Sequence, residues 1–328
     1  MIILQPPFVQ IESTRSEHFT REPPFVVYVI IPVHNNWSYT QECLEQLRKQ
    51  DFPQLHLIVV DDGSTDSTKE ILSTEYPEVD RLQGDGNLWW AGAVQLGVDY
   101  ALARCEPTDH LLLLNNDTRF PNDLVGRLLG SSEAVGQGIV AAACASNEKG
   151  ERIDVGGAYD WPNCRRLTTM DLMAEKGVSS GLMELEFLMS RAVLYPADCF
   201  SALGGFEPES LPHYHADMAF THRAREAGYR LVVDLDTEVT VYETPSTSGI
   251  QFGAEPISFY RAFQILTSKK SSFQPQYWAR AVDICCPEPY RFANKWSFFC
   301  AALANSVGRT NWGRLLLQGY REFVRHLR

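Results

Sequence analysis

The sequence lacks the features that mark several large classes of protein. Its eight cysteines include no C-x-x-C pair, and Cys285 and Cys286 are adjacent, which places their Cα atoms too close for an ordinary disulfide. Free thiols in a reducing compartment are therefore expected, which favours a cytoplasmic protein. The longest stretch that could suggest a membrane span, residues 296–308, has 13 uncharged residues, whereas a spanning helix needs about 20. The N-terminus also lacks the basic and apolar regions of a signal peptide.

Positive charge is scarce over most of the chain. Residues 1–260 hold 18 Lys and Arg against 38 Asp and Glu, whereas residues 261–328 hold 11 against 3. An acidic body argues against nucleic-acid binding, because that affinity comes largely from cationic contacts with phosphates. The basic C-terminal region favours a local anionic partner. That partner is either the inner face of a membrane, bound peripherally, or the acidic body of a second copy in a homodimer.

Apolar runs and helical segments alternate from residue 25 onward. The 328-residue chain is long enough for one large α/β domain with additions, or for two modest domains. Predicted strands at 25–32, 55–60, 79–83 and 110–114 alternate with predicted helices at 38–50, 65–72 and 90–104. This alternation indicates parallel βαβ units. After about residue 145 the rhythm breaks, and residues 255–328 are helical in composition.

Two adjacent aspartates, Asp61 and Asp62, end the second predicted strand in the segment VVDDGSTDST. A turn at Gly63 and a helix cap explain the residues that follow. They do not explain two carboxylates at the end of a buried strand, where repulsion and desolvation cost energy unless a ligand is bound. Ligands of open α/β sheets bind beyond the carboxyl ends of the strands. We therefore expect these carboxylates to accept hydrogen bonds from a pyrimidine imide or from ribose hydroxyls.

The fourth predicted strand ends in the same way, in LLLLNNDTRF. Asp117 offers the carboxylate oxygen that Mg²⁺ or Mn²⁺ requires, while Asn115 and Asn116 can hydrogen-bond a ribose or phosphate without adding charge. The alternative interpretation is an Asn/Asp turn after a strand.

The segment DGNLWWAGA (85–93) matches a glycine-rich phosphate loop only in part. Gly84 and Gly86 lack the third glycine of the dinucleotide fingerprint, which argues against a nicotinamide oxidoreductase. Core packing explains one of the two tryptophans, Trp89 and Trp90. The alternative for this segment is a helix start of small residues beside a nucleotide.

Asp217 falls in the first turn of a predicted helix, after His213 and His215. The helix dipole favours the ionised carboxylate there, which is the form that a general base requires. The alternative is a helix-start aspartate that follows two surface histidines. The sequence offers no convincing third ligand for the histidine pair, so a zinc site is not predicted.

Seven segments carry a family resemblance when they are taken together: IIPVHNN, LRKQDFP, LIVVDDGSTDSTKEIL, GDGNLWWAGAVQLGVDYA, LLLLNNDTRFPNDLV, LGGFEPE and HADMAFTHRAREAGYR. In order and spacing they are similar to the family-2 inverting glycosyltransferases with the GT-A fold, over residues 25–245. The resemblance implies an α/β protein with a Rossmann-like, mostly parallel central sheet flanked by helices, followed here by a helical C-terminal extension.

The resemblance also implies roles for individual residues. Asp217 matches the general base, and Asp117 matches the ligand of Mg²⁺ or Mn²⁺. Contact with the nucleotide sugar is implied for Pro32, His34, Asn35, Asp61 and especially Asp62, Gly86, Asn87, Trp90, Asn115 and Asn116. A place on the acceptor side is implied for Gly204, Gly205, Phe206 and His215.

The sequence departs from the family pattern at three positions. Asn115 replaces the first aspartate of the Asp-x-Asp motif, and Ala216 replaces the glutamate of the Glu-Asp pair. A late histidine often assists the metal in such enzymes, and this chain offers Glu243 instead. These departures put the affinity for the metal and the metal's identity in doubt.

The implied reaction moves a sugar from a UDP- or dTDP-linked donor to a hydroxyl of a glycan or lipid-linked acceptor, with inversion, in cell-surface polysaccharide or glycoconjugate synthesis. Some relatives with a similar tryptophan-containing loop, a rhamnosyltransferase-like subgroup, use dTDP-rhamnose. The alternative function is a non-catalytic scaffold that binds a nucleotide sugar within a glycan-assembly complex. Asn115 and Ala216 encourage that alternative, whereas Asp117 and Asp217 oppose it.

Three segments are expected along the chain. Residues 1–24 form an N-terminal arm, residues 25–245 the GT-A domain, and residues 246–328 a helical basic extension. Within the domain, residues 25–145 are expected to form the nucleotide-binding half and residues 146–245 the acceptor half.

Overall fold

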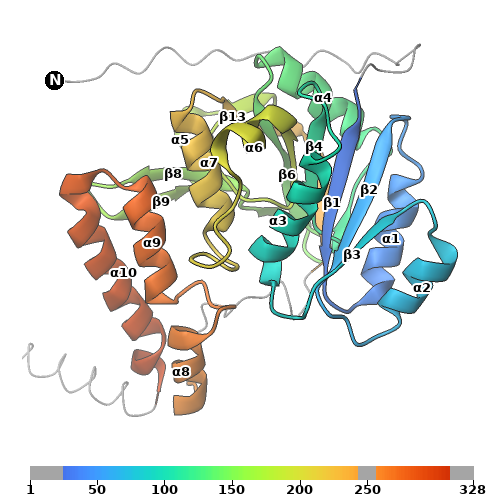
Figure 1. Cartoon of the computed structure of the whole chain (residues 1–328). Helices are drawn as coiled ribbons and strands as arrows, with labels where there is room; N and C mark the ends of the chain where they lie inside the picture. The colour runs from blue at the N-terminus through green and yellow to red at the C-terminus, as the bar shows by residue number, and fades with distance from the viewer. Residues whose placement is uncertain (1–24, 243–255, 311–328) are drawn as a thin grey trace, which may run out of the picture.

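The computed structural model describes residues 25–242 and 256–310. An α/β body carries a group of three helices at one end (Figure 1). The elements of the body, in chain order, are β1 (Val27–Val33), α1 (Trp37–Leu47), β2 (Leu55–Asp61), α2 (Thr68–Glu75), β3 (Asp80–Gln83), α3 (Trp89–Leu102), β4 (His110–Leu114), β5 (Thr118–Arg119), α4 (Leu124–Ala134), β6 (Ile139–Ser146), β7 (Arg152–Ile153), β8 (Gly156–Asp160), β9 (Arg165–Thr168), α5 (Thr169–Lys176), β10 (Leu182–Glu184), β11 (Phe187–Leu188), β12 (Ala192–Pro196), α6 (Ala197–Leu203), α7 (Ala216–Glu226) and β13 (Leu231–Val241). The C-terminal helices are α8 (Phe259–Thr267), α9 (Pro275–Cys285) and α10 (Arg291–Asn305), with short 3-10 turns η1 (Glu288–Tyr290) and η2 (Val307–Arg309).

The central sheet has the strand order β10-β13-β6-β12-β4-β1-β2-β3, with β5 and β7 paired at its side. Strands β3, β2, β1 and β4 are parallel, and β13 is parallel to β6. Because β12 is antiparallel to both of its neighbours, β4 and β6 also point the same way. The predicted α/β class, with a mostly parallel sheet flanked by helices, is therefore confirmed.

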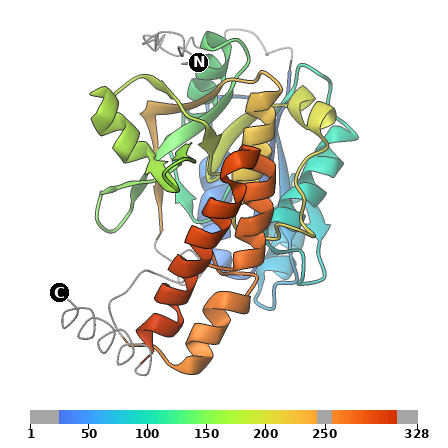
Figure 2. The same ribbon diagram turned by 90° about the vertical axis from the view of Figure 1, so that its left-hand side faces the viewer.

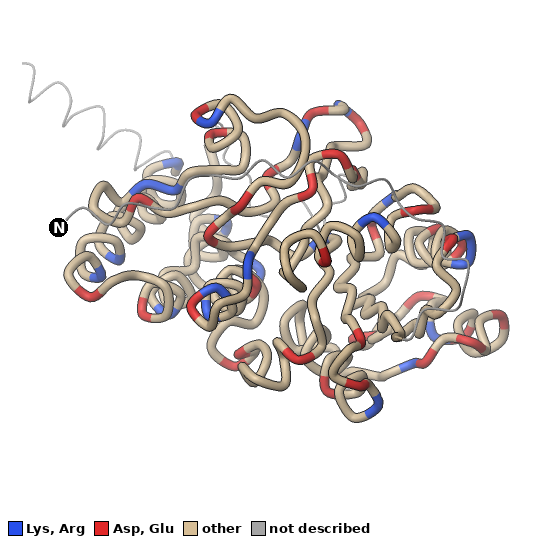
Figure 3. Tube along the Cα trace, turned by 90° about the horizontal axis from the view of Figure 1, so that it is seen from above, with Lys and Arg blue, Asp and Glu red and all other residues tan. Residues whose placement is uncertain are grey.

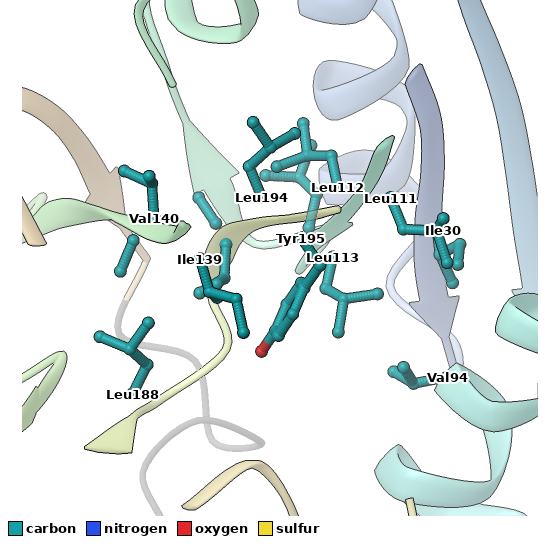
Figure 4. Close-up of a cluster of buried hydrophobic side chains, with 14 of the residues drawn as sticks. Ile30, Val94, Leu111, Leu112, Leu113, Ile139, Val140, Leu188, Leu194 and Tyr195 are labelled. Carbon is teal, nitrogen blue, oxygen red and sulfur yellow. The ribbon is translucent and has the colours of Figure 1, made fainter. Parts of the chain in front are cut away.

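The apolar runs of the sequence form the sheet core. All five residues of β4 are buried, as a strand covered on both faces requires. Figure 4 shows Leu112 and Leu113 of β4 beside Leu194 and Tyr195 of β12. We expect truncation of Leu113 to alanine to lower the free energy of unfolding by about 2–5 kcal/mol, the usual cost of a cavity in a packed core.

Helix α3 lies close against the sheet because small residues line its inner face. A Cβ atom added at Gly97 would lie 2.5 Å from Cγ2 of Ile30 on β1, and 3.2 Å from Cγ2 of Val60 on β2. This close approach fixes the N-terminal end of α3, at Trp89, beside the carboxyl ends of β1 and β2.

The segment after residue 146 completes the same sheet. Strands β10, β12 and β13 pair with the nucleotide-side strands through β6 and β4. A separate three-stranded sheet, in the order β11-β8-β9, lies next to α7. The two halves that the sequence predicts to meet at residue 145 therefore share one sheet.

Helices α9 and α10 run side by side, with α8 at their lower end (Figures 1 and 2). Helix α9 packs on α7, and its Trp278 belongs to a group of aromatic rings with Tyr159 and Trp161. None of the helices in the two described segments is both long enough and apolar enough to cross a membrane. The predicted arm at 1–24 and the last residues of the extension, 311–328, lie outside the described residues.

Candidate active site

The loop after β1 is tied to the loop after β2. Asn35 has a left-handed backbone (φ 60°), and its side-chain Oδ1 accepts from the backbone N–H of Thr65 at 2.7 Å and of Asp66 at 3.3 Å. The N–H of Asn35 donates to the Ser64 hydroxyl at 2.7 Å, and His34 Nδ1 donates to the carbonyl of Asp62 at 2.7 Å. The polar groups of Asn35 therefore shape the loop, whereas the ring of His34 is exposed.

The two adjacent aspartates have different surroundings. Asp62 accepts three backbone N–H groups, from Gly86 at 2.8 Å, Leu88 at 3.2 Å and Trp89 at 2.9 Å. Its carboxylate thus holds the loop that precedes α3. Asp61 is equally buried, and its Oδ1 accepts from Ser64 N–H at 2.9 Å. Its Oδ2 is buried and has no hydrogen-bond partner in the described part of the chain.

The resemblance implies a nucleotide contact especially for Asp62, whereas the carboxylate oxygen that lacks a partner among the described residues belongs to Asp61. A buried carboxylate oxygen without a partner costs free energy unless a ligand supplies the missing donor. Asp61 offers such an oxygen, whereas three backbone donors already occupy Asp62. The loop after β2 lies so close to the loop before α3 that position 63 requires a glycine. A Cβ added at Gly63 (φ 70°) would lie 2.8 Å from the Cα of Gly86.

The loop before α3 reaches the end of β4. Trp90 Nε1 donates to Oδ1 of Asn115 at 3.1 Å, and Asn116 Nδ2 donates to the Thr40 hydroxyl on α1 at 2.9 Å. Gly86 and Asn87 are exposed at the tip of the loop, and Pro32 is half-buried at the end of β1. These hydrogen bonds connect the loops that follow β1, β2 and β4 with the loop before α3. The residues predicted to contact the nucleotide sugar therefore lie in neighbouring loops.

Asp117 is buried at 6% exposure, and its Oδ1 has no hydrogen-bond partner within the described residues. Burial raises the pKa of Asp117 to about 6, and the charge of Arg191 acts in the opposite direction. An unpaired carboxylate oxygen fits a divalent cation that takes one protein carboxylate and completes its shell with phosphates and water. No cluster of three or more His, Cys, Asp or Glu side chains suited to a metal occurs in residues 25–242 and 256–310. Glu243 lies outside those residues.

Asp217 occupies the first turn of α7, as predicted. Its Oδ2 accepts from the N–H of Ser190 at 3.0 Å and its Oδ1 from the N–H of Met218 at 2.8 Å. Burial raises the pKa of Asp217, while these two N–H groups and the charge of Arg191 oppose the shift. A carboxylate whose pKa is raised is a stronger base, and each oxygen keeps a lone pair for a substrate proton.

Arg191 lies in the segment that links the motifs of Asp117 and Asp217, and no motif in the sequence pointed to it. Its charge acts on both Asp117 and Asp217, and its Nη1 donates to the carbonyl of Asp154 at 2.7 Å. Its own carbonyl accepts from Asn115 N–H at 2.9 Å, while the preceding residue, Ser190, donates to Asp217. The segment 190–191 therefore touches both motifs. In the sequence, Arg191 is marked only as a single positively charged residue directly before the apolar run AVLYP.

The residues predicted for the acceptor side pack mainly inward. Phe206 is 5% exposed and lies edge-on to Trp90, at 5.6 Å between ring centroids. Its N–H donates to Oε1 of Gln95 at 2.6 Å, and a Cβ added at Gly205 would lie 2.3 Å from the same oxygen. Gly204 ends α6 in a left-handed conformation. This turn fixes the position of α6 against α3 rather than presenting side chains to a ligand.

His215 also contacts protein rather than open space. Its ring lies edge-on to Trp278 of α9, at 5.2 Å between centroids. Burial lowers the pKa of His215 to about 4, so the ring is neutral at physiological pH. The histidine thus forms part of the seam between α7 and the C-terminal helices, directly before Ala216 and Asp217.

A groove of about 390 Å³ lies between α3 and the segment that leads to α7. Its lining includes Asn87, Gln95, Asp99, Pro208, Glu209 and Lys269. Polar groups mixed with flat apolar ones suit sugar rings. The lining includes neither Asp117 nor Asp217, so the two carboxylates do not face this groove.

Comparison with known proteins includes two relatives that each match nearly two thirds of the chain. The chain is 27% identical over 237 residues to the succinoglycan biosynthesis protein ExoA of Rhizobium meliloti, covering 65% of this chain and 62% of that protein. It is 27% identical over 215 residues to an uncharacterized protein of Mycobacterium tuberculosis, covering 64% and 71%.

Solved structures agree with this relationship in fold. S. aureus TarS in complex with UDP superposes with a TM-score of 0.52 at 17% identity, covering 91% of this chain and 92% of that one. A mannosyltransferase of Pyrobaculum calidifontis in complex with GDP-Man and Mn²⁺ gives 0.51 at 17% identity, covering 92% and 82%. These likenesses support the GT-A fold. A family model described as glycosyl transferase family 2 matches residues 28–194, just over half of the chain, and the protein therefore belongs to that family.

Proposed function

We propose that this glycosyltransferase moves a sugar from a UDP- or dTDP-linked donor to an acceptor hydroxyl in a single displacement. One observation carries the proposal: the segment 190–191 contacts both motifs, since the N–H of Ser190 donates to Asp217 at 3.0 Å and the carbonyl of Arg191 accepts from the N–H of Asn115 at 2.9 Å. The two carboxylates come from distant parts of the sequence, and we infer that they serve one site. A general base on one side of the sugar and a diphosphate site on the other side suit a direct displacement.

Asp217 acts as the general base in this proposal. It takes the proton of the acceptor hydroxyl while that oxygen forms a bond to the anomeric carbon. The bond from the anomeric carbon to the phosphate oxygen breaks, and the nucleoside diphosphate leaves with the electron pair. The attacking and leaving oxygens lie on opposite faces of the sugar, so the configuration inverts. A positioned base contributes roughly 10²–10⁴-fold to such a step.

Asp117 would hold Mg²⁺ or Mn²⁺ through its unpaired Oδ1. A divalent ion bound there would neutralise charge on the diphosphate. Arg191 has a separate role, because its positive charge acts on both Asp117 and Asp217. This charge also favours the ionised form of Asp217 that accepts the proton.

The donor base is proposed to meet Asp61. Its buried Oδ2 can accept the imide N–H of a uracil or thymine, which a purine base does not present in the same form. Ribose and phosphate contacts are assigned to the exposed residues His34, Gly86 and Asn87. Support for a nucleotide-sugar donor also comes from the solved relatives, which hold UDP, UDP-GlcNAc or GDP-Man.

The acceptor is proposed to be a glycan or a lipid-linked glycan of cell-surface polysaccharide synthesis, handled at the inner face of the membrane. The printed name of the relative from Rhizobium meliloti, a succinoglycan biosynthesis protein, supports this class. A non-catalytic scaffold is the less favoured function, since a scaffold has no need of a carboxylate held in the first turn of α7 with a raised pKa.

A thermal-shift panel tests the donor. We expect UDP, dTDP and their sugar conjugates to raise the melting temperature more than GDP or ADP, and more strongly with Mn²⁺ than without it. A panel in which no nucleotide shifts the melting temperature would contradict nucleotide-sugar binding. Donor hydrolysis, followed as release of nucleoside diphosphate, then separates an enzyme from a scaffold.

A further inference from the structure

Large exposed apolar side chains gather in the C-terminal helices. Among the described residues, every large hydrophobic side chain that is well exposed lies between residues 259 and 307. Three are on α8 and three on α10, and we name these six the aromatic surface: Phe259 (60% exposed), Tyr260 (71%), Phe263 (63%), Phe292 (79%), Trp296 (58%) and Phe299 (39%). Such a concentration marks an interaction site, since single exposed hydrophobic residues are normally scattered.

Helix α10 has two apolar faces. Phe298 stacks on Trp278 of α9, and Ala302 is fully buried against α8 and α9. Phe292, Trp296 and Phe299 follow one another at helical spacing on the other side of α10, where the described chain does not cover them. The inner face is sufficient to hold the helix in place. The outer stripe therefore needs another explanation.

The net charge of residues 256–310 indicates which kind of partner the aromatic surface would bind. Residues 256–310 hold seven Lys and Arg against two Asp and Glu, whereas residues 25–242 hold 16 against 33. Figure 3 shows the acidic residues spread over the α/β body. Among the described residues, neither Arg261 nor Lys270 forms an ion pair with a carboxylate. An anionic surface would thus attract α8 to α10 and repel the body, which orients the molecule.

We propose that the aromatic surface of α8 and α10 docks on an anionic lipid surface. Aromatic side chains beside lysine and arginine are the composition that lies at the boundary between headgroups and acyl chains. Tyr260 and Trp296 each have an apolar ring with a polar group, which suits that boundary. Four of the six residues of the aromatic surface fall within the basic region 261–328 noted in the sequence.

Membrane docking would also explain where the acceptor comes from, a step that rests on the proposed function. The inner side of the same helices contacts His215, two residues before Asp217. The aromatic surface of α10 is therefore separated from the α7 seam by about one helix diameter, roughly 10 Å. A lipid-linked acceptor anchored at the surface would present its headgroup near the proposed base.

Vesicle co-sedimentation of the full chain tests the docking. We expect binding to vesicles that contain phosphatidylglycerol, and much weaker binding to phosphatidylcholine alone. The variant F292S/W296S/F299S should bind the anionic vesicles at least about tenfold less tightly, and W296S alone should bind less tightly by a smaller factor. R261Q on α8 should weaken binding at low salt, whereas the matched body variant R127Q should not.

The controls separate docking from catalysis. The three substituted rings are exposed, so the triple variant should keep the melting temperature and the donor hydrolysis of the unchanged protein. Equal vesicle binding by the triple variant, or no binding by the unchanged protein, would overturn the proposal while leaving the proposed function intact. Loss of a dimer in the triple variant without a change in vesicle binding would also overturn it, because the surface would then join two copies.

Discussion

The loops at the ends of β1 and β2 differ from the region around α7 in how their polar groups are paired. In the loops, polar groups are largely satisfied by one another, as the three N–H groups on Asp62 and the two on Asn35 show. In the second region, Asp217 of α7 and Asp117 after β4 are desolvated, and the charge of Arg191 acts on both. The first region therefore suits the proposed contact with a nucleotide. The second holds the groups whose charge changes or is compensated in the proposed reaction.

This contrast sets the kind of effect that a substitution should have. Changes in the strand-end loops should lower stability or nucleotide affinity, and changes around Asp217 should alter rate and pH dependence.

Asp217→Asn should lower the transfer rate by roughly 10²–10⁴-fold, because the amide keeps the shape and loses the base. Donor affinity, measured by titration, should stay unchanged, since the proposed partner of Asp217 is the acceptor hydroxyl. A variant that transfers sugar at the normal rate would remove the base from the account.

Arg191→Gln should slow transfer by roughly 10²-fold, in the range seen when a charge-stabilising donor is removed from an active site. The pH profile gives a sharper readout. Asp217 must be ionised to accept a proton, so activity falls as the pH drops through its pKa. The Arg191 charge lowers that pKa, and its loss should move the acidic limb to higher pH.

The matched variant Arg191→Lys keeps the charge and should leave the acidic limb closer to its original place. If the limb of Arg191→Gln does not move, the guanidinium does not act on Asp217.

Asp117→Ala should weaken Mn²⁺-dependent donor binding by roughly 10–100-fold, the range found when support for a metal site is lost. The affinity measured without metal provides the control and should change little. Equal affinities with and without Mn²⁺ in the unchanged protein would exclude a metal role for Asp117.

The aspartate pair after β2 gives the smallest and most selective effects. Asp62→Asn should lower the free energy of unfolding in urea by about 1–3 kcal/mol, because buried N–H groups lose their acceptor. Asp61→Asn should leave stability nearly unchanged and weaken pyrimidine nucleotide binding, because an amide N–H would face the imide. The reverse outcome would exchange the roles of the two residues.

Much of the architecture could be predicted from local sequence. The leucine run of β4 and the turn residues after it specify a buried strand with a polar end. The first turn of α7 likewise follows from its residues. The predicted second helix, at 65–72, instead spans Thr68–Glu75, because the side chain of Asp66 accepts from Thr68 N–H and holds the preceding residues in a turn.

Arg191 could not be predicted in the same way. Its position depends on β12, which inserts antiparallel between β4 and β6 and so brings residue 191 to Asn115. Such long-range pairing has no local signature. The inward packing of Phe206 and the contact of His215 with Trp278 have the same origin, since each depends on an element distant in sequence.

The configuration of the product tests the central claim most directly. With a donor identified by the nucleotide panel, the anomeric configuration of the glycoside can be read from its proton NMR spectrum. A single displacement assisted by Asp217 predicts a product of configuration opposite to that of the donor. A product that retains the donor's configuration would contradict the proposed mechanism.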